Sequence, residues 1–237
     1  MLKPDFITFT GADDLNHVDE LQQFAKDRKV EFAILFSESR EGTSRYPERD
    51  KIEEFRSAAT PLGGTLDLAA HLCGAWAREV IELGTSEADR ILSGFSRVQI
   101  NVGRLKQPDH QINLVHRWAR RLEDRFGHSV QPILQCRDTF PDDARVAWLY
   151  DCSGGRGTIP DSWPAPPHDG DVEIGYAGGM GPDNVAEILQ TIGASGRGWI
   201  DMESRVRNAH DQFDLNLCSL VYDRAGMGDP VALIPTN

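Results

Sequence analysis

Short apolar runs alternate with segments of helical periodicity along most of the chain. Eight runs have the length and apolar content of buried β-strands, namely residues 6–10, 31–36, 65–73, 97–102, 131–136, 146–150, 172–177 and 198–202. Between most of these runs, hydrophobic residues recur every three or four positions, which is typical of a helix that packs on a sheet. The clearest helix covers residues 111–126, where Ile112, Val115, Trp118 and Leu122 fall on one stripe. Strands that alternate with helices predict an all-parallel sheet.

The number of strands indicates how this sheet is closed. Eight strands in a chain of 237 residues favour a (β/α)8 barrel, the TIM-barrel fold, and an open doubly wound sheet is the alternative. The first strand is followed by TGADD and not by a GxGxxG turn, so the nucleotide-binding signature of many open sheets is missing. Residues 140–144 have room for one helical turn, and the proline-rich residues 160–167 are interpreted as a loop in place of a helix. We expect a single barrel domain over residues 1–237.

Composition and charge narrow the possible partners. The net charge of −12 argues against binding to a nucleic-acid backbone, and no basic stripe is present. No apolar run approaches the roughly 20 residues that a membrane span needs, and the N-terminal residues lack the layout of a signal peptide. The cysteines form no CxxC pair and no dense framework, which is typical of reduced thiols. We expect a cytoplasmic monomer or homodimer without nucleic-acid or membrane partners.

Two glycine-rich turns follow consecutive predicted strands. One strand leads through Asp151 into GGRG at residues 154–157, and the next leads into Gly178 and Gly179, after which Pro-Asp-Asn opens a helix. Glycine lets the backbone approach a ligand closely, and the beginning of a helix carries partial positive charge. Two such turns at neighbouring strand ends predict a phosphate site. We expect a small phosphorylated metabolite, held by backbone amides and local arginines.

Polar residues gather at the predicted carboxyl ends of the strands, where the active sites of such barrels lie. Alternation along each strand selects Thr8, Thr10, Ser37, His71, Cys73, Gln99, Asn101, Gln135, Arg137, Asp151, Asp201 and Glu203. Hydrogen-bonded polar residues also line barrel mouths without chemistry, and we prefer this interpretation for Gln99 and Gln135. Asp151 directly precedes a glycine loop, which favours a functional role.

His71 has two interpretations, and neither is preferred. An imidazole titrates near neutral pH and could act as a general base, but a buried histidine can also be purely structural. Cys73, Cys136 and Cys152 also fall near strand ends, yet their separations carry no metal-ligand signature, so small buried hydrophobes are the better interpretation. No lysine lies in a predicted strand, which argues against a Schiff-base mechanism. We expect no metal and no cofactor.

Four segments carry a likeness to a known family, namely TSRY at 43–46, WLYDCSGGRG at 148–157, AGGMGPDNV at 177–185 and WIDMESRV at 199–206, and the third is the most specific. Together they resemble phosphoribosylanthranilate isomerase, a ribulose-phosphate-binding barrel enzyme of tryptophan synthesis. The resemblance implies an Amadori rearrangement in which Asp151 is the general acid that protonates the furanose ring oxygen. It implies that Arg45 pairs with the anthranilate carboxylate. It also implies a phosphate site made of Gly155, Gly157, Gly178, Gly179, Ser204 and Arg205.

The first strand departs from this family. The family's general base is a cysteine in a KICG-like motif, and Thr10 stands at that position here. A threonine hydroxyl is far too weakly acidic to serve as a free base near neutral pH. Either His71 or Glu203 takes over that step, or the protein does not catalyse it. Three functions therefore stay open: a phosphosugar isomerase with the same or an altered substrate, an epimerase, lyase or aldolase acting on a phosphorylated or carboxylated small molecule, and a non-catalytic binder of a phosphate ligand.

Overall fold

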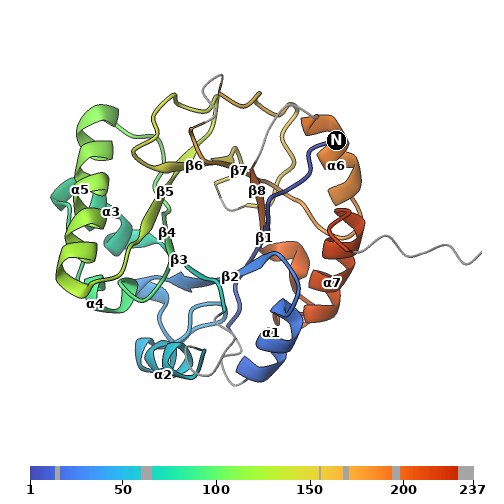
Figure 1. Ribbon diagram of the computed structural model, residues 1–237, viewed down its shortest axis with the longest axis horizontal. Coiled ribbons are helices and arrows are strands. Elements are labelled where there is room, and N and C mark those ends of the chain that lie inside the picture. The colour runs from blue at the N-terminus through green and yellow to red at the C-terminus, as the bar shows by residue number, and fades with distance from the viewer. Residues whose placement is uncertain (14–16, 60–65, 155, 168–170, 194–197, 229–237) are drawn as a thin grey trace, which may run out of the picture.

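The computed structural model describes residues 1–13, 17–59, 66–154, 156–167, 171–193 and 198–228. Its parallel strands pair in sequence order and the last pairs with the first, so the sheet closes into the expected barrel with helices outside it (Figure 1). The strands are β1 Ile7–Thr10, β2 Val30–Phe36, β3 Leu68–Leu72, β4 Arg97–Ile100, β5 Gln131–Cys136, β6 Ala147–Asp151, β7 Ile174–Ala177 and β8 Trp199–Met202. The predicted (β/α)8 barrel is confirmed.

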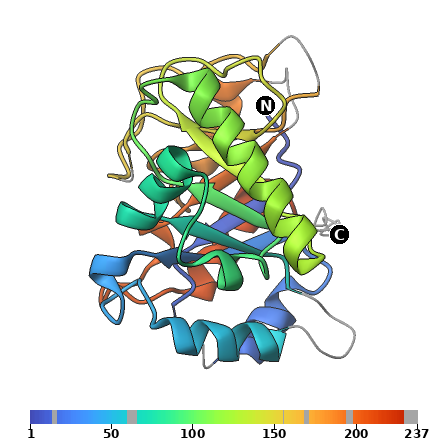
Figure 2. The same ribbon diagram turned by 90° about the vertical axis from the view of Figure 1, so that its left-hand side faces the viewer.

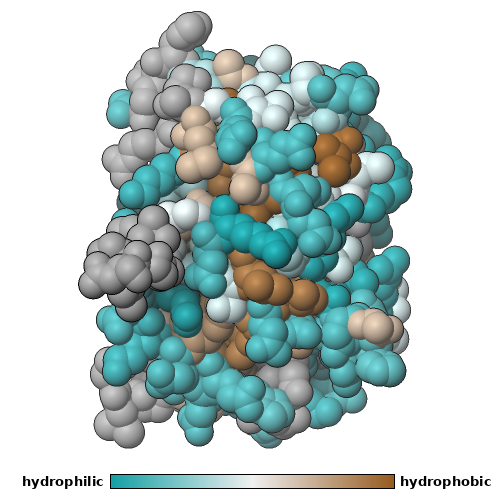
Figure 3. Space-filling view, turned by 90° about the vertical axis from the view of Figure 1, so that its right-hand side faces the viewer, coloured by the Kyte–Doolittle hydropathy of each residue, from teal (hydrophilic) through white to brown (hydrophobic). Residues whose placement is uncertain are grey.

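Helices cover the outside of the barrel, with α5 running along it (Figure 2). They are α1 Val18–Ala25, α2 Arg49–Ala59, α3 Gly74–Leu83, α4 Asp89–Leu92, α5 Pro108–Phe126, α6 Val185–Ile192 and α7 Leu215–Arg224, with 3-10 turns η1 Glu38–Arg40 and η2 Ser204–Val206. The side that carries α6 and α7 is mostly hydrophilic, with a band of apolar residues near its centre (Figure 3). Over the described ranges, no helix is both long and apolar enough to cross a membrane.

The connections on both sides of β6 contain no helix in their described residues. The helical turn expected at residues 140–144 is wrong, because the Asp143 carboxylate binds Arg145 and its carbonyl accepts from Trp148 Nε1 at 2.9 Å. The loop expected at residues 160–167 is confirmed. The hydroxyls of Tyr150 and Tyr176 donate to its carbonyls, and the ring of Trp163 packs edge-on against both tyrosines. Aromatic packing thus replaces a helix behind β6 and β7.

Side chains fill the interior of the barrel near the amino ends of the strands, and the interior near the carboxyl ends is left open. Trp199 lies in the barrel with Ile133, Ala147 and Leu149, and a Cβ on Gly175 would come within 2.2 Å of its indole. The Arg97 guanidinium stacks on that indole at 4.0 Å. It also pairs with two glutamates, one of which, Glu31, is buried. This layer fills the barrel at the amino ends of the strands, and the inner cavity opens at their carboxyl ends.

Candidate active site at the carboxyl ends of the strands

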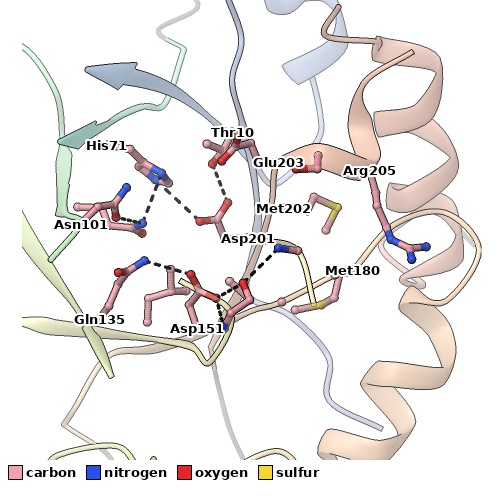
Figure 4. A pocket seen from close by; sticks show the side chains of 18 residues that line it. Thr10, His71, Asn101, Gln135, Asp151, Met180, Asp201, Met202, Glu203 and Arg205 are labelled. Carbon is pink, nitrogen blue, oxygen red and sulfur yellow. Dashed lines mark hydrogen bonds and ion pairs between the residues drawn. The ribbon is translucent and has the colours of Figure 1, made fainter. Parts of the chain in front are cut away.

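An inner cavity of about 80 Å³ opens at the carboxyl ends of the strands. Every strand except β2 contributes to its wall, either directly or through the loop that follows. The polar lining residues are Thr10, His71, Gln99, Asn101, Gln135, Asp151, Ser153, Asp201, Glu203, Ser204 and Arg205. Three of them carry carboxyl groups, namely Asp151, Asp201 and Glu203. Asp201 lies nearer to Thr10, and Asp151 lies nearer to Gln135 (Figure 4).

Asp151 is held by the loop that follows it. Its Oδ1 accepts hydrogen bonds from the Ser153 amide at 3.0 Å, the Ser153 hydroxyl at 2.7 Å and the Gly154 amide at 3.1 Å. Gly154 has φ of 60°, a left-handed conformation that glycine adopts without strain and that turns the loop back over the carboxylate. Gln135 Nε2 donates to Oδ2 at 3.3 Å, so this glutamine contacts the candidate acid directly. The strand end and its glycine turn therefore fix the direction of the Asp151 side chain.

Asp201 at the end of β8 has an unusual environment for a carboxyl group. It is 6% exposed, and Thr10 Oγ1 donates to its Oδ1 at 2.7 Å. Burial raises its pKa to about 8; the Thr10 hydrogen bond opposes this shift, and the negative charges of Glu203, Glu31 and Asp151 add to it. Asp201 therefore carries a proton at neutral pH and exchanges it near pH 8. The sequence placed Asp201 at the barrel mouth but did not single it out as an acid or base.

His71 lies in the cavity wall, beside Asp201 and Gln99. Its Nε2 is 3.9 Å from Asp201 Oδ2 and its Nδ1 is 3.5 Å from Gln99 Nε2. Burial lowers the pKa of His71 to about 3, and the charge of Arg97 contributes. The imidazole is therefore neutral near pH 7, and its contact with Asp201 is polar and not ionic. A catalytic role for His71 stays a prediction, and such a low pKa makes it a weak proton acceptor.

The two glycine turns meet at one edge of the cavity, beside Ser204. A Cβ on Gly179, whose φ is 61°, would lie 2.6 Å from the carbonyl oxygen of Gly157, so only glycine fits there. Asn184 holds this turn, because its Oδ1 accepts from the Gly181 amide and its Nδ2 donates to the Gly179 carbonyl, both at 2.9 Å. Gly178 also lines the cavity. The structure thus brings four of the predicted phosphate residues together: Gly157, Gly178, Gly179 and Ser204.

The other two predicted phosphate residues stand apart from this group. Gly155 lies outside the described residues. Arg205 lines the cavity with its stem, while its guanidinium points away from Asp151 and Asp201 (Figure 4). A Cβ on Gly181 would meet the Arg205 side chain at 2.5 Å, so the arginine stem packs on the turn after β7. Its predicted role in binding phosphate stays a prediction.

An outer cleft of about 680 Å³ adjoins the inner cavity, and Asn101, Gln135 and Glu203 line both. Arg45 lines only this cleft, and its guanidinium is already engaged. Its Nη2 donates to Asp211 Oδ1 at 2.5 Å, and its Nη1 donates to Glu203 Oε1 at 2.7 Å. Arg45 in turn holds the pKa of Asp211 well below its usual range. The predicted pairing of Arg45 with a substrate carboxylate stays a prediction.

Comparison with known proteins identifies the fold. No family model and no curated protein sequence matches the chain. Among solved structures, TrpF from Jonesia denitrificans is 16% identical, with a TM-score of 0.58 over 93% of this chain and 96% of that one. N-(5'-phosphoribosyl)anthranilate isomerase from Pyrococcus furiosus is 14% identical, with a TM-score of 0.56 over 93% of this chain and 98% of that one. The chain shares their fold.

A third solved structure holds a ligand. Phosphoribosyl anthranilate isomerase in complex with reduced 1-(o-carboxyphenylamino)-1-deoxyribulose 5-phosphate is 12% identical, with a TM-score of 0.55 over 95% of this chain and 99% of that one. Identities this low establish a common barrel and leave the activity open. The site of this chain therefore has to be judged on its own residues.

Burial favours the protonated thiol of two cysteines near the strand ends. Burial raises the pKa of the Cys73 thiol, whose sulfur accepts from Asn101 Nδ2 at 3.3 Å. Burial also raises the pKa of Cys136, to about 12. In the part of the chain that the structure describes, no three His, Cys, Asp or Glu side chains are placed to share a metal ion.

Proposed function

We propose that this protein is an isomerase of a small phosphorylated sugar derivative, with Asp151 and Asp201 as its acid and base. The observation that carries the proposal is the pair of buried carboxyl groups on both sides of β7. The strand register pairs Asp151 with Ala177 and Ala177 with Asp201, so the two aspartates lie at one level of the barrel. Two strand spacings separate their Cα atoms by at most about 10 Å, which leaves room for a small molecule between the side chains.

Asp151 is the proposed general acid, in agreement with the resemblance of its strand and glycine loop. It would donate a proton to the ring oxygen of the sugar as the ring carbon–oxygen bond breaks. In a sugar that carries an amine at C1, ring opening leaves a Schiff base, and a second group must remove the proton at C2. The base then has to stand elsewhere in the cavity, because Asp151 is held at one side of it by its own loop.

Asp201 is the proposed base. Thr10, which occupies the position of the family's catalytic cysteine, hydrogen-bonds Asp201 Oδ1 and thereby places this carboxyl group beside that position. A carboxylate with a pKa of about 8 accepts a proton far more readily than an ordinary one. The two bases considered from the sequence are less suited, because Arg45 binds Glu203 and the pKa of His71 is only about 3.

The remaining cavity wall suits a phosphorylated sugar. The phosphate would bind at the edge formed by Gly157, Gly178, Gly179 and Ser204, where two backbone turns and a hydroxyl converge. Gln99 Oε1 is buried and finds no hydrogen-bond donor among the described residues. An unpaired buried acceptor costs free energy, and a substrate hydroxyl would satisfy it. A polar ligand is therefore the natural occupant of the cavity.

The test is a fluorescence assay of turnover with freshly generated phosphoribosylanthranilate and with a panel of phosphorylated aldoses. We expect turnover by the wild type and a loss of at least about 100-fold in both Asp151→Asn and Asp201→Asn. Both variants should still bind inorganic phosphate, measured as a rise in melting temperature. The matched control is Asp138→Asn, which replaces an exposed carboxylate outside the cavity. Full activity of both variants would overturn the assignment, and wild-type binding without any turnover would leave a non-catalytic binder.

A second candidate is an epimerase that acts on a phosphorylated sugar without an anthranilate group. It is favoured by the state of Arg45, whose ion pairs with Asp211 and Glu203 occupy the side chain that would bind anthranilate. Two carboxyl groups on either side of a carbon atom also suit removal and return of a proton on opposite faces. Exchange of substrate hydrogen with deuterated solvent, without formation of a ketose, would identify this reaction.

A further inference from the structure

The outer cleft is lined by more arginines than carboxylates, although the protein as a whole is strongly acidic. Its charged lining residues are three arginines against two carboxylates, namely Arg40, Arg45, Arg137, Glu203 and Asp211. Arg45 binds both carboxylates. In a chain of net charge −12, a cleft with uncompensated positive charge is suited to an anionic ligand.

Arg40 and Arg137 differ in what they already contact. Arg40 donates from Nη1 to the Tyr46 hydroxyl at 3.3 Å and lies over the same ring, with 5.4 Å between Cζ and the ring centroid. Arg137 has no hydrogen bond and no ion pair with any residue that the structure describes. It is thus the arginine of the cleft whose donors are available for a ligand.

Arg137 is exposed, and its guanidinium lies beside the loop that follows β6. Arg137 directly follows β5, and a Cβ on Gly154 would lie 2.7 Å from its Nη2 and 3.3 Å from its Cζ. The guanidinium therefore lies close to Gly154, and a larger residue at that position would displace it. The amide of that same glycine donates to Asp151 Oδ1 at 3.1 Å. Arg137 accordingly sits on the loop that carries the proposed acid, where the outer cleft meets the inner cavity.

We propose that Arg137 binds a second anionic group of the substrate, a carboxylate, in the outer cleft. The inference rests on the proposed function, because the same ligand would place its phosphate at the glycine turns of the inner cavity. A guanidinium binds a carboxylate through two parallel hydrogen bonds, so it selects a planar anion in one orientation. Asn101 and Gln135 line both spaces and make the path between the two ends of such a ligand continuous. In this arrangement Arg45 stays paired with Glu203 and Asp211.

The experiment measures binding and does not require turnover. Isothermal titration compares reduced 1-(o-carboxyphenylamino)-1-deoxyribulose 5-phosphate, which has both anionic groups, with ribulose 5-phosphate, which lacks the carboxylate together with the aromatic ring and amine that carry it. We expect the wild type to bind the carboxylated ligand more tightly than ribulose 5-phosphate. Arg137→Gln should weaken the binding of the carboxylated ligand at least about tenfold. Ribulose 5-phosphate should bind both proteins equally. Arg137→Lys should retain part of the preference for the carboxylated ligand, because lysine keeps the positive charge but cannot form two parallel hydrogen bonds.

Two control variants distinguish a contact made by Arg137 from a general loss of positive charge. Arg104→Gln removes the same charge from an exposed residue that pairs with Asp138 and lines neither cavity, and it should bind both ligands like wild type. Arg45→Gln should weaken the carboxylated ligand less than Arg137→Gln does. Equal binding of the two ligands by wild type, an Arg137→Gln variant that binds like wild type, or a larger loss in Arg45→Gln would each overturn the inference. Because no turnover is measured, an inactive protein that binds as expected would refute only the proposed function.

Discussion

Replacing Asp201 with asparagine should stabilise the protein, by an amount that grows with pH. The amide has nearly the shape of the carboxyl group, and its oxygen can still accept the hydrogen bond from Thr10. What the substitution removes is a buried group whose pKa rises on folding from 3.8 to about 8. A group with a raised pKa in the folded state stabilises fully below its unfolded pKa, and this stabilisation is lost as pH rises through the folded pKa.

The size of the effect follows from this shift. Between pH 4 and pH 8 the contribution of Asp201 to the free energy of unfolding falls by at most about 1.4 kcal/mol per pH unit. Between pH 5 and pH 7 the variant should therefore gain up to about 3 kcal/mol relative to wild type, or roughly 6–12 °C in melting temperature for a chain of this size. His71, whose pKa is lowered, acts in the opposite sense below pH 6.5, so the effect of Asp201 is measured as the difference between variant and wild type at each pH.

The assay is urea unfolding of wild type and Asp201→Asn at half-unit steps from pH 4 to pH 9. The difference between the two free energies of unfolding should be smallest at pH 4, rise steadily, and level off above pH 8. Asp138→Asn, whose side chain is 75% exposed, should show no such trend. A difference that stays constant with pH, or one that shrinks as pH rises, would refute the description of Asp201 as a buried, protonated carboxyl group.

Three further predictions concern the same cavity. Because His71 has a lowered pKa, its contribution to stability is lost as pH falls below 6.5, and His71→Gln should gain stability relative to wild type there; thermal melts of both proteins at pH 4.5 and pH 7.5 test this. Gly179→Ala should lower the free energy of unfolding in urea by at least about 2 kcal/mol and weaken phosphate binding. Gly127 has a similar φ but open space around it, so Gly127→Ala should lower the free energy of unfolding by only about 1 kcal/mol. If Asp201 is the base, kcat/KM should rise with pH to an inflection near 8, and a profile that falls there would reverse its role.

The alternation of apolar runs and helical stripes was sufficient to predict the barrel, because both patterns are local. Predicted strand limits coincide with those of the structure at β5 and lie within a few residues of them elsewhere. Agreement is poorer where a helix depends on its surroundings. The helical turn expected at residues 140–144 does not form, because the Asp143 carbonyl accepts from the Trp148 indole and the Asp143 carboxylate binds Arg145.

The candidate site divides in the same way. Asp151 and the glycine turns could be located from the sequence alone, because a carboxylate followed by glycines at a strand end is a pattern of adjacent residues. The partnership of Thr10 with Asp201 joins residues 191 positions apart, and that of Arg45 with Asp211 joins residues 166 positions apart. A pattern of adjacent residues cannot predict a contact between residues so far apart in the sequence. Burial and neighbouring charges set the pKa values of Asp201 and His71, and only closure of the barrel brings those neighbours together.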